Sequence, residues 1–309
     1  MNNPQFVYLE DEKSLSEKTK QTIGVPLRLF DLKGLYIDQE KFLREIAPTF
    51  SMLAWDFYDV KRAQVEFLKS RYYYERHRLD IFLGDYYMKR VTLEAVGDLI
   101  ADLSETDRHV FNRVVPRRKR SIAKFDLNCV DDKWQIERLK CESFVQNVTA
   151  SDPRSLKRIF NETSELVTAK PCFKQLIGSI ADMAAMAERE YKQRDAQKIK
   201  MTFHQVSLLA DIINEGRGAP EGIHQDGADY IVSALVIERI GIIGGESVIY
   251  FPDRETELWR HTLLPGQGIF QADQGTCLWH DVTPIRDDPT TPPPDGNRNT
   301  FGFDINVIE

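Results

Sequence analysis

Residues 220–250 read PEGIHQDGADYIVSALVIERIGIIGGESVIY, and this stretch predicts both the fold and a cluster of polar groups. It opens with His224 and Asp226, a His-x-Asp pair flanked by Gly222 and Gly227. Residues two apart in a strand point to the same face, and where a strand meets a turn they can converge on one point. One imidazole and one carboxylate at this spacing can provide two neighbouring ligands for a divalent metal.

His280 is the candidate for a third metal ligand. Two histidines and one carboxylate that leave other positions open form the ligand set of non-haem Fe(II) oxygenases. His204 and His261 compete with it: His204 could be a hydrogen-bonded core histidine in a strand, and His261 lies in a charged segment. Because a lone His-x-Asp pair also arises by chance, the hypothesis depends on its combination with the strands and the arginine that follow.

The composition is that of an ordinary globular chain. Its 309 residues, 42% hydrophobic and 29% charged, are enough for one large domain or two small ones. A net charge of −7 gives no global attraction to nucleic acid. The acidic start lacks an apolar signal core, no run of about 18 apolar residues occurs, and the cysteines form no CxxC pair. We therefore expect a cytoplasmic protein, monomeric or homodimeric, without a membrane helix.

The first hundred residues are predicted to form a helical layer, because apolar residues recur every three or four positions from residue 38 onward. The basic run at 117–120 is interpreted as a solvated turn. A hairpin is predicted from 121–129 and 133–141. Three further elements are expected before residue 200: a short strand at 144–149, a helical region from 152, and a long helix over 173–197.

The remainder of the chain favours short strands. Glycine and proline turns separate them, which is typical of an antiparallel sandwich or barrel. The predicted strands are 200–212, 230–238, 247–251, 262–264, 268–271, 276–278 and 301–308.

An arginine near the last strand suggests a co-substrate. Iron held by one carboxylate keeps net positive charge, which a bidentate dianion such as 2-oxoglutarate would neutralise. The far carboxylate of that dianion then needs a partner, and the planar fork of arginine suits it. Arg298 precedes the last predicted strand and Thr300 shares its face, while Arg286 is the alternative.

Several motifs resemble a known family. Residues 220–227 and 244–250, together with His204-Gln205, are similar to the bacterial Fe(II)/2-oxoglutarate dioxygenases that hydroxylate free amino acids, the isoleucine dioxygenase type. The segment 116–160, which contains Gln146 and Arg158, also resembles them. The similarity covers about residues 110–309, so the helical residues 1–109 fall outside it, and Arg298-Asn299 stands where the family usually has Arg-Asp.

The resemblance implies an α+β protein with a double-stranded β-helix core, that is, a cupin-like jelly roll, over 110–309. A helical region at 1–109 and helices on the major sheet would pack against it. It implies Fe(II) on His224, Asp226 and His280, 2-oxoglutarate held by Arg298 with Thr300 beside it, and O2 as the oxidant.

The expected activity is C–H hydroxylation of a small free amino acid in biosynthesis, with succinate and CO2 as by-products. Gln146 and Arg158 are the candidate substrate contacts, although Arg158 could equally be a surface residue of a helix. Fungal relatives form aziridines, so oxidative cyclisation or desaturation of a branched amino acid is an alternative. A catalytically silent ligand-binding β-barrel and a metal-dependent isomerase without 2-oxoglutarate are the alternatives from other classes.

Overall fold

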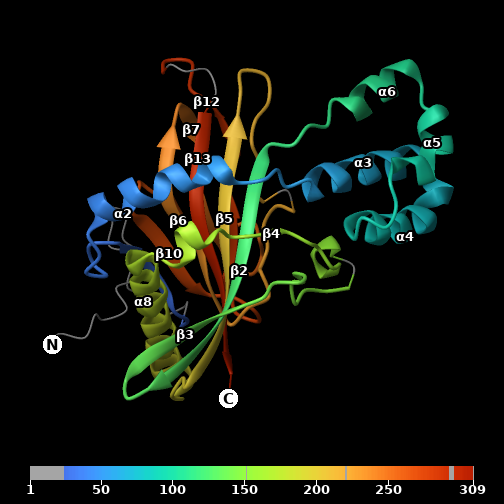
Figure 1. Cartoon of the computed structure of the whole chain (residues 1–309). Helices are drawn as coiled ribbons and strands as arrows, with labels where there is room; N and C mark the ends of the chain where they lie inside the picture. Colours follow the sequence, from blue (N-terminus) through green and yellow to red (C-terminus); the bar gives the residue numbers. More distant parts are fainter. Residues whose placement is uncertain (1–23, 151, 220, 292–295, 309) are drawn as a thin grey trace.

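A computed structural model describes residues 24–150, 152–219, 221–291 and 296–308. Eight of the described strands form one large sheet: β1 (Leu27–Asp31), β2 (Arg118–Val130), β3 (Lys133–Leu139), β4 (Asn161–Glu162), β5 (Lys198–Ala210), β6 (Tyr230–Ile240), β10 (Gln267–Ala272) and β13 (Gly296–Ile308). Their order is β1-β10-β6-β13-β5-β2-β3 with antiparallel neighbours, and β4 lies parallel to β2. Figure 1 shows the long central strands β2, β5 and β13 side by side.

Two smaller sheets complete the strand architecture. One contains β8 (Ser247–Tyr250), β9 (Glu257–His261) and β11 (Trp279–Val282), and the other pairs β7 (Ile242–Gly244) with β12 (Ile285–Asp287). Buried residues such as Ile249 and Trp259 join the first of these to Ala234 of β6 in one apolar cluster. Antiparallel layers accompanied by helices confirm the predicted α+β class and are consistent with a jelly-roll core.

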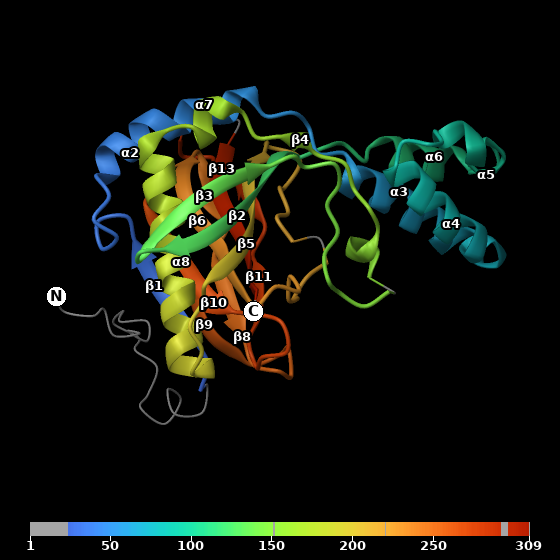
Figure 2. The same ribbon diagram turned by 60° about the horizontal axis from the view of Figure 1, so that its bottom comes forward.

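The helices fall into two groups (Figures 1 and 2). Their bounds are α2 (Gln39–Ile46), α3 (Tyr58–Arg71), α4 (Arg76–Tyr87), α5 (Gly97–Ala101), α6 (Glu105–Asn112), α7 (Glu165–Thr168) and α8 (Pro171–Ala187), with short turns η1 (Ala47–Met52), η2 (Tyr73–Glu75), η3 (Leu93–Val96), η4 (Pro153–Ser155) and η5 (Glu188–Lys192). Helices α2 and α8 lie against the large sheet, whereas α3 to α6 extend to one side of it. Within the described residues, every helix is too short or too polar to span a bilayer.

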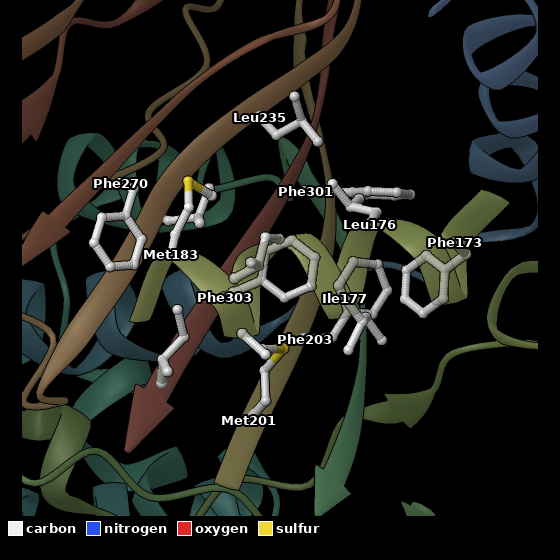
Figure 3. Close-up of a cluster of buried hydrophobic side chains, with 14 of the residues drawn as sticks. Phe173, Leu176, Ile177, Met183, Met201, Phe203, Leu235, Phe270, Phe301 and Phe303 are labelled. Atoms are coloured by element: carbon white, nitrogen blue, oxygen red, sulfur yellow. The ribbon is translucent and has the colours of Figure 1, made fainter. Parts of the chain in front are cut away.

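The central strands have one apolar and one polar face. Phe203 of β5 packs edge-on against Phe301 of β13 at 4.7 Å and against Phe173 of α8 at 4.8 Å between ring centroids (Figure 3). Arg298 and Thr300 of β13 line a cavity on the other face. Because neighbouring residues of a strand point to opposite sides, the strands that bury phenylalanines under α8 also deliver polar side chains to the cavity.

A second apolar cluster attaches α3 to α6 to the sheet. It includes Leu68 of α3, Phe82 of α4 and Ile122 of β2, all buried. Phe160 packs against Tyr58 at 4.9 Å and against Phe144 at 6.1 Å between ring centroids. Burying large aromatic side chains fixes the helices relative to β2, so the helical region forms a wall of the cavity described below.

The segment between β3 and α8 differs from its prediction. The expected strand at 144–149 is wrong, and of the helical region expected from 152 only the short elements η4 and α7 form. Between β3 and β4, Phe144 and Arg158 instead form a bridge in which they exchange backbone hydrogen bonds of 2.8 and 3.0 Å. Packing of Phe144 and Phe160 in the second cluster outweighs the local helical pattern.

Other predicted boundaries also move. The long helix ends at Ala187 rather than at 197, because the charged run folds around Glu188, whose buried carboxylate meets Lys192 and Arg194. The strand predicted at 276–278 is wrong: the Gln225 amide donates to the carbonyls there, and the strand, β11, begins at Trp279. The strand predicted at 262–264 is also wrong: these residues connect two strands, and the observed strand β9 ends before them at His261.

Candidate metal centre and active site

The loop that carries His224 lies beside β11. His224 and His280 form an antiparallel bridge in which their backbones exchange hydrogen bonds of 2.9 and 3.0 Å. This bridge places the two imidazoles 4.3 Å apart between ring centroids. Residues distant in sequence therefore share one point of the cavity through backbone pairing alone.

Asp226 completes the cluster. Its Oδ1 lies 3.5 Å from Nε2 of His224, and its Oδ2 lies 3.4 Å from Nε2 of His280. One ligand atom from each of the three residues lies within 4.8 Å of the others. Both histidines are 8% exposed. Two imidazoles and one carboxylate gathered in this way match the donor set of a non-haem Fe(II) site.

Hydrogen bonding prepares His224 as a ligand. Its Nδ1 lies 2.7 Å from the carbonyl oxygen of Gly222, so Nδ1–H donates there and Nε2 is free to bind a metal. Burial favours the neutral ring, but the hydrogen bond to Asp226 and the nearby Glu221 outweigh it and raise the pKa of His224 to about 9. A metal ion bound here would take the place of a proton held between His224 and Asp226.

Asp273, which lies between the predicted strands 268–271 and 276–278, supports the centre. Its buried Oδ2 accepts from the backbone N–H groups of Asp226, Gly227 and Ala228 at 2.9, 2.7 and 3.2 Å. Its Oδ1 lies 4.0 Å from Nδ1 of His280, and neither atom has a hydrogen-bond partner among the described residues. Asp273 thus holds the loop that carries Asp226 and faces His280.

Gly227 allows this loop to approach the neighbouring segment. It adopts φ +87°, and a Cβ at this position would lie 2.4 Å from the carbonyl oxygen of Asn147. Only glycine fits both the backbone conformation and the space. The residue next to the predicted metal ligand is therefore fixed by geometry, as its flanking position in the sequence suggests.

Arg298 offers a cation deeper in the cavity. It is 5% exposed, and its Nε and Nη2 atoms have no hydrogen-bond partner among the described residues. Burial, and then the charge of Arg239, lowers the pKa of Arg298 to about 9. A buried guanidinium with free donors fits the far carboxylate of 2-oxoglutarate, and Thr300 lines the same cavity. Arg286 is exposed and pairs with Glu215 at 3.2 Å, outside this site.

The two predicted substrate contacts form a chain of hydrogen bonds that starts at Asp226. Gln146 donates from Nε2 to Oδ1 of Asp226 at 2.7 Å, and its Oε1 accepts from Nη2 of Arg158 at 2.7 Å. Arg158 is 6% exposed, which excludes the alternative of a surface residue. The structure therefore brings all the predicted site residues, His224, Asp226, His280, Arg298, Thr300, Gln146 and Arg158, to one cavity.

The basic run at 117–120 is not a solvated turn, and this interpretation is wrong. Residues 118–120 lie in β2, where alternate residues share a face, and Arg118 and Arg120 point into the cavity. Arg118 pairs with Asp56 at 2.8 Å and with Asp59 at 2.9 Å. His204 is a satisfied core histidine: its Nδ1 accepts from Arg120 at 2.8 Å, and its Nε2 lies 2.9 Å from Asp304.

The family model for 2OG-Fe dioxygenase matches residues 100–304. The chain belongs to the 2OG-Fe dioxygenase family. The dioxygenase is therefore an oxidoreductase that uses Fe(II), 2-oxoglutarate and O2, as expected from the sequence. Membership of this family favours an enzyme over a silent ligand-binding barrel.

Three solved structures are similar to the dioxygenase, and the first of them shares its fold. A bsmA homolog from Methylobium petroleophilum PM1 has a TM-score of 0.60 and 17% identity, over 91% of this chain and 88% of that one. IDO from Bacillus thuringiensis has a TM-score of 0.48 and 16% identity, over 62% of this chain and 79% of that one. The Fe(II)/α-ketoglutarate-dependent dioxygenase TqaL has a TM-score of 0.45 and 14% identity, over 82% of this chain and 91% of that one. No curated protein sequence matches significantly.

Proposed function

We propose that this dioxygenase hydroxylates a C–H bond of a small free amino acid. The observation that carries the proposal is the chain of contacts from Asp226 through Gln146 to Arg158. It places a buried cation that can bind a substrate carboxylate one side chain away from the metal cluster. A substrate held there presents its nearby carbons to the metal.

His224, Asp226 and His280 would bind Fe(II), and Arg298 with Thr300 would bind the far carboxylate of 2-oxoglutarate. When bound, iron, 2-oxoglutarate and O2 supply the oxidising power: one oxygen atom enters the substrate C–H bond, and the other leaves in succinate together with CO2. The unpaired nitrogens of Arg298 support this assignment, because a buried donor without a partner is costly unless a ligand meets it.

The chain's own residues orient the reactants. Gln146 donates to Oδ1 of Asp226 and so restricts rotation of that carboxylate, while Arg158 would hold the substrate carboxylate. Glu221 lies in the same cavity, with Oε1 3.6 Å from Nε2 of His224 and 3.6 Å from Nη1 of Arg154. Its pKa lies below the usual range, because His224 and Arg154 outweigh burial, so it offers a negative charge for a substrate ammonium.

Residues 1–109 and 110–309 are proposed to act as one functional unit. Residues 1–23 lie outside the described residues. From the rest of the first part, Tyr58, Asp59 and Arg62 of α3 and Tyr87 of α4 line the cavity. The helical region would thus form the substrate-facing wall opposite the metal cluster.

The test is substrate-dependent succinate release. Protein with Fe(II), ascorbate and 2-oxoglutarate is incubated with each of a panel of free amino acids, in air and anaerobically, and products are analysed by mass. The proposal predicts oxygen-dependent succinate with one amino acid and a mass gain of one oxygen atom. Loss of two hydrogens instead would assign cyclisation or desaturation, and succinate release that no amino acid stimulates would contradict the amino-acid proposal.

A further inference from the structure

Besides Arg298, two arginines of the cavity have no acidic partner among the described residues. Arg120 of β2 donates to Nδ1 of His204 at 2.8 Å, and Arg158 donates to Oε1 of Gln146 at 2.7 Å and to the carbonyl of Arg154 at 3.2 Å. The Nε atoms of both arginines are buried without a hydrogen-bond partner among the described residues. In that part of the chain, neither guanidinium lies within ion-pair distance of a carboxylate.

Their neighbours in the same cavity are paired differently. Arg118 meets Asp56 at 2.8 Å and Asp59 at 2.9 Å, and Arg154 meets Asp152 at 2.8 Å. Buried charges in proteins are normally paired, because transfer of an ion out of water is costly. The contrast marks Arg120 and Arg158 as cations that the folded chain leaves for a ligand.

The two arginines flank one pair of aromatic rings. The guanidinium carbon of Arg120 lies 5.6 Å from the ring centroid of Phe144 and 4.7 Å from that of Phe160. The corresponding distances for Arg158 are 5.1 and 5.8 Å. Rings at this distance hold the guanidinium groups in place and offset part of their desolvation without neutralising their charge.

His204 fixes the orientation of Arg120. Arginine only donates hydrogen bonds, so Nδ1 of His204 must accept, and the proton of the neutral ring is on Nε2. Nε2–H then donates to Asp304 at 2.9 Å. Burial lowers the pKa of His204, which keeps the ring neutral. Because the partner is neutral, the hydrogen bond orients Arg120 without placing a carboxylate in direct contact with it.

We propose that Arg120 and Arg158 together form a carboxylate subsite for the prime substrate, separate from the 2-oxoglutarate arginine Arg298. The inference rests on the proposed function, and it narrows the substrate class to small molecules whose carboxylate lies a few bonds from the oxidised carbon. Amines and carboxamides of the same shape are excluded, because an ammonium group repels the two buried cations and a neutral amide leaves them unpaired.

Binding to the Zn(II)-loaded full chain, which does not turn over, tests the subsite by calorimetry. The probes are isovalerate and isovaleramide, which share a branched chain and differ in charge, and each is titrated in the presence of saturating 2-oxoglutarate. The charge-assisted hydrogen bonds predict that isovalerate binds at least about tenfold more tightly than the amide.

Variants assign the effect to individual residues. Arg120→Gln and Arg158→Gln are each expected to weaken isovalerate binding about tenfold or more and to leave 2-oxoglutarate affinity unchanged. Arg120→Lys keeps the charge without the fork and is expected to retain part of the affinity. Arg298→Gln is expected to weaken 2-oxoglutarate binding instead. Lys119→Gln is the matched control, because Lys119 neighbours Arg120 on β2 but lies over the ring of Trp55.

Equal binding of the two probes, or no isovalerate binding at millimolar concentration, would overturn the subsite. So would Arg120→Gln and Arg158→Gln proteins that keep a wild-type melting temperature and wild-type isovalerate affinity, or that lose 2-oxoglutarate binding instead. If no amino acid elicits succinate while isovalerate binding still requires both arginines, the subsite stands and the amino-acid proposal falls.

Discussion

The two ends of the cavity differ in how their charged side chains are paired. At the metal end, Asp226 lies between His224 and His280 and accepts from Gln146, so its charge is met on several sides. At the opposite wall, Arg120 and Arg158 have only neutral hydrogen-bond partners within the described part of the chain. Arg118 lies two residues from Arg120 on the same face of β2, yet two carboxylates meet it. The comparison indicates that a buried arginine without a carboxylate partner marks a ligand site, whereas a buried arginine with one belongs to a structural ion pair.

The largest expected effect is at the metal end. Asp226→Ala removes the carboxylate between the two histidines, and iron affinity and turnover should both fall by more than the 10- to 100-fold typical of losing an outer partner. Iron content after anaerobic loading and succinate release measure the change. Glu255→Ala, at an exposed turn, is the control. An Asp226→Ala protein that still binds iron stoichiometrically would show that the cluster is not the metal site.

The arginines at the opposite wall give a stability test of the comparison. Arg118→Met leaves Asp56, whose side chain is 0% exposed, without its main partner, which should lower the free energy of unfolding by about 3–5 kcal/mol. Arg120→Met strands no carboxylate and leaves only Nδ1 of His204 without its donor, so the ligand-free protein should lose much less stability. Urea unfolding of both variants measures the difference. Equal losses would mean that Arg120 is a structural residue after all.

Asp273→Asn tests the support behind the metal end. The amide oxygen can still accept from the backbone N–H groups, but its NH2 group would face Nδ1 of His280 and favour the proton on Nε2, the metal-binding nitrogen. Metal affinity should fall about 10- to 100-fold, as measured by competition with a chelator. If the Asp273→Asn protein has an altered melting temperature but the metal affinity of wild type, Asp273 acts in loop folding alone.

A smaller effect concerns pH. Burial raises the pKa of Asp59 to about 6, against the opposing charge of Arg118. Between the ordinary value of 3.8 and about 6, the folded state therefore binds more protons than the unfolded state, and stability falls as pH rises through this window.

Asp59→Asn should remove that dependence. Relative to wild type, the variant should gain on the order of 1–2 kcal/mol in unfolding free energy between pH 4 and pH 7, since Asp59 is partly exposed. Urea midpoints of both proteins at the two pH values measure it. If wild type and Asp59→Asn differ by the same unfolding free energy at pH 4 and pH 7, the pKa of Asp59 is not raised.

The sequence predicted the metal end better than the wall. The His-x-Asp pair between glycines, a later histidine and an arginine before the last strand are local patterns, and the structure brings these residues together. That they bind iron and 2-oxoglutarate stays a proposal. Hydrophobic alternation likewise predicted the hairpin of β2 and β3 and most strands of the jelly-roll core.

The wall depends on contacts that no local pattern records. The two-residue periodicity of a strand places Arg118 and Arg120 on one face. Their partners, however, are distant in sequence: His204 lies 84 residues from Arg120, and Asp56 lies 62 residues from Arg118. The run therefore resembled a solvated turn. Asp273 escaped notice for the same reason, because its turn composition says nothing about the backbone N–H groups that it accepts across 45–47 residues.

Visible absorption of the anaerobic protein with Fe(II) and 2-oxoglutarate tests the central claim most directly, since iron chelated by a 2-oxo acid gives a charge-transfer band. The account predicts the band in wild type, its loss in Asp226→Ala, and a need for more 2-oxoglutarate in Arg298→Gln. A wild-type protein without the band, or an Asp226→Ala protein that keeps it, would contradict an Fe(II) centre on His224, Asp226 and His280.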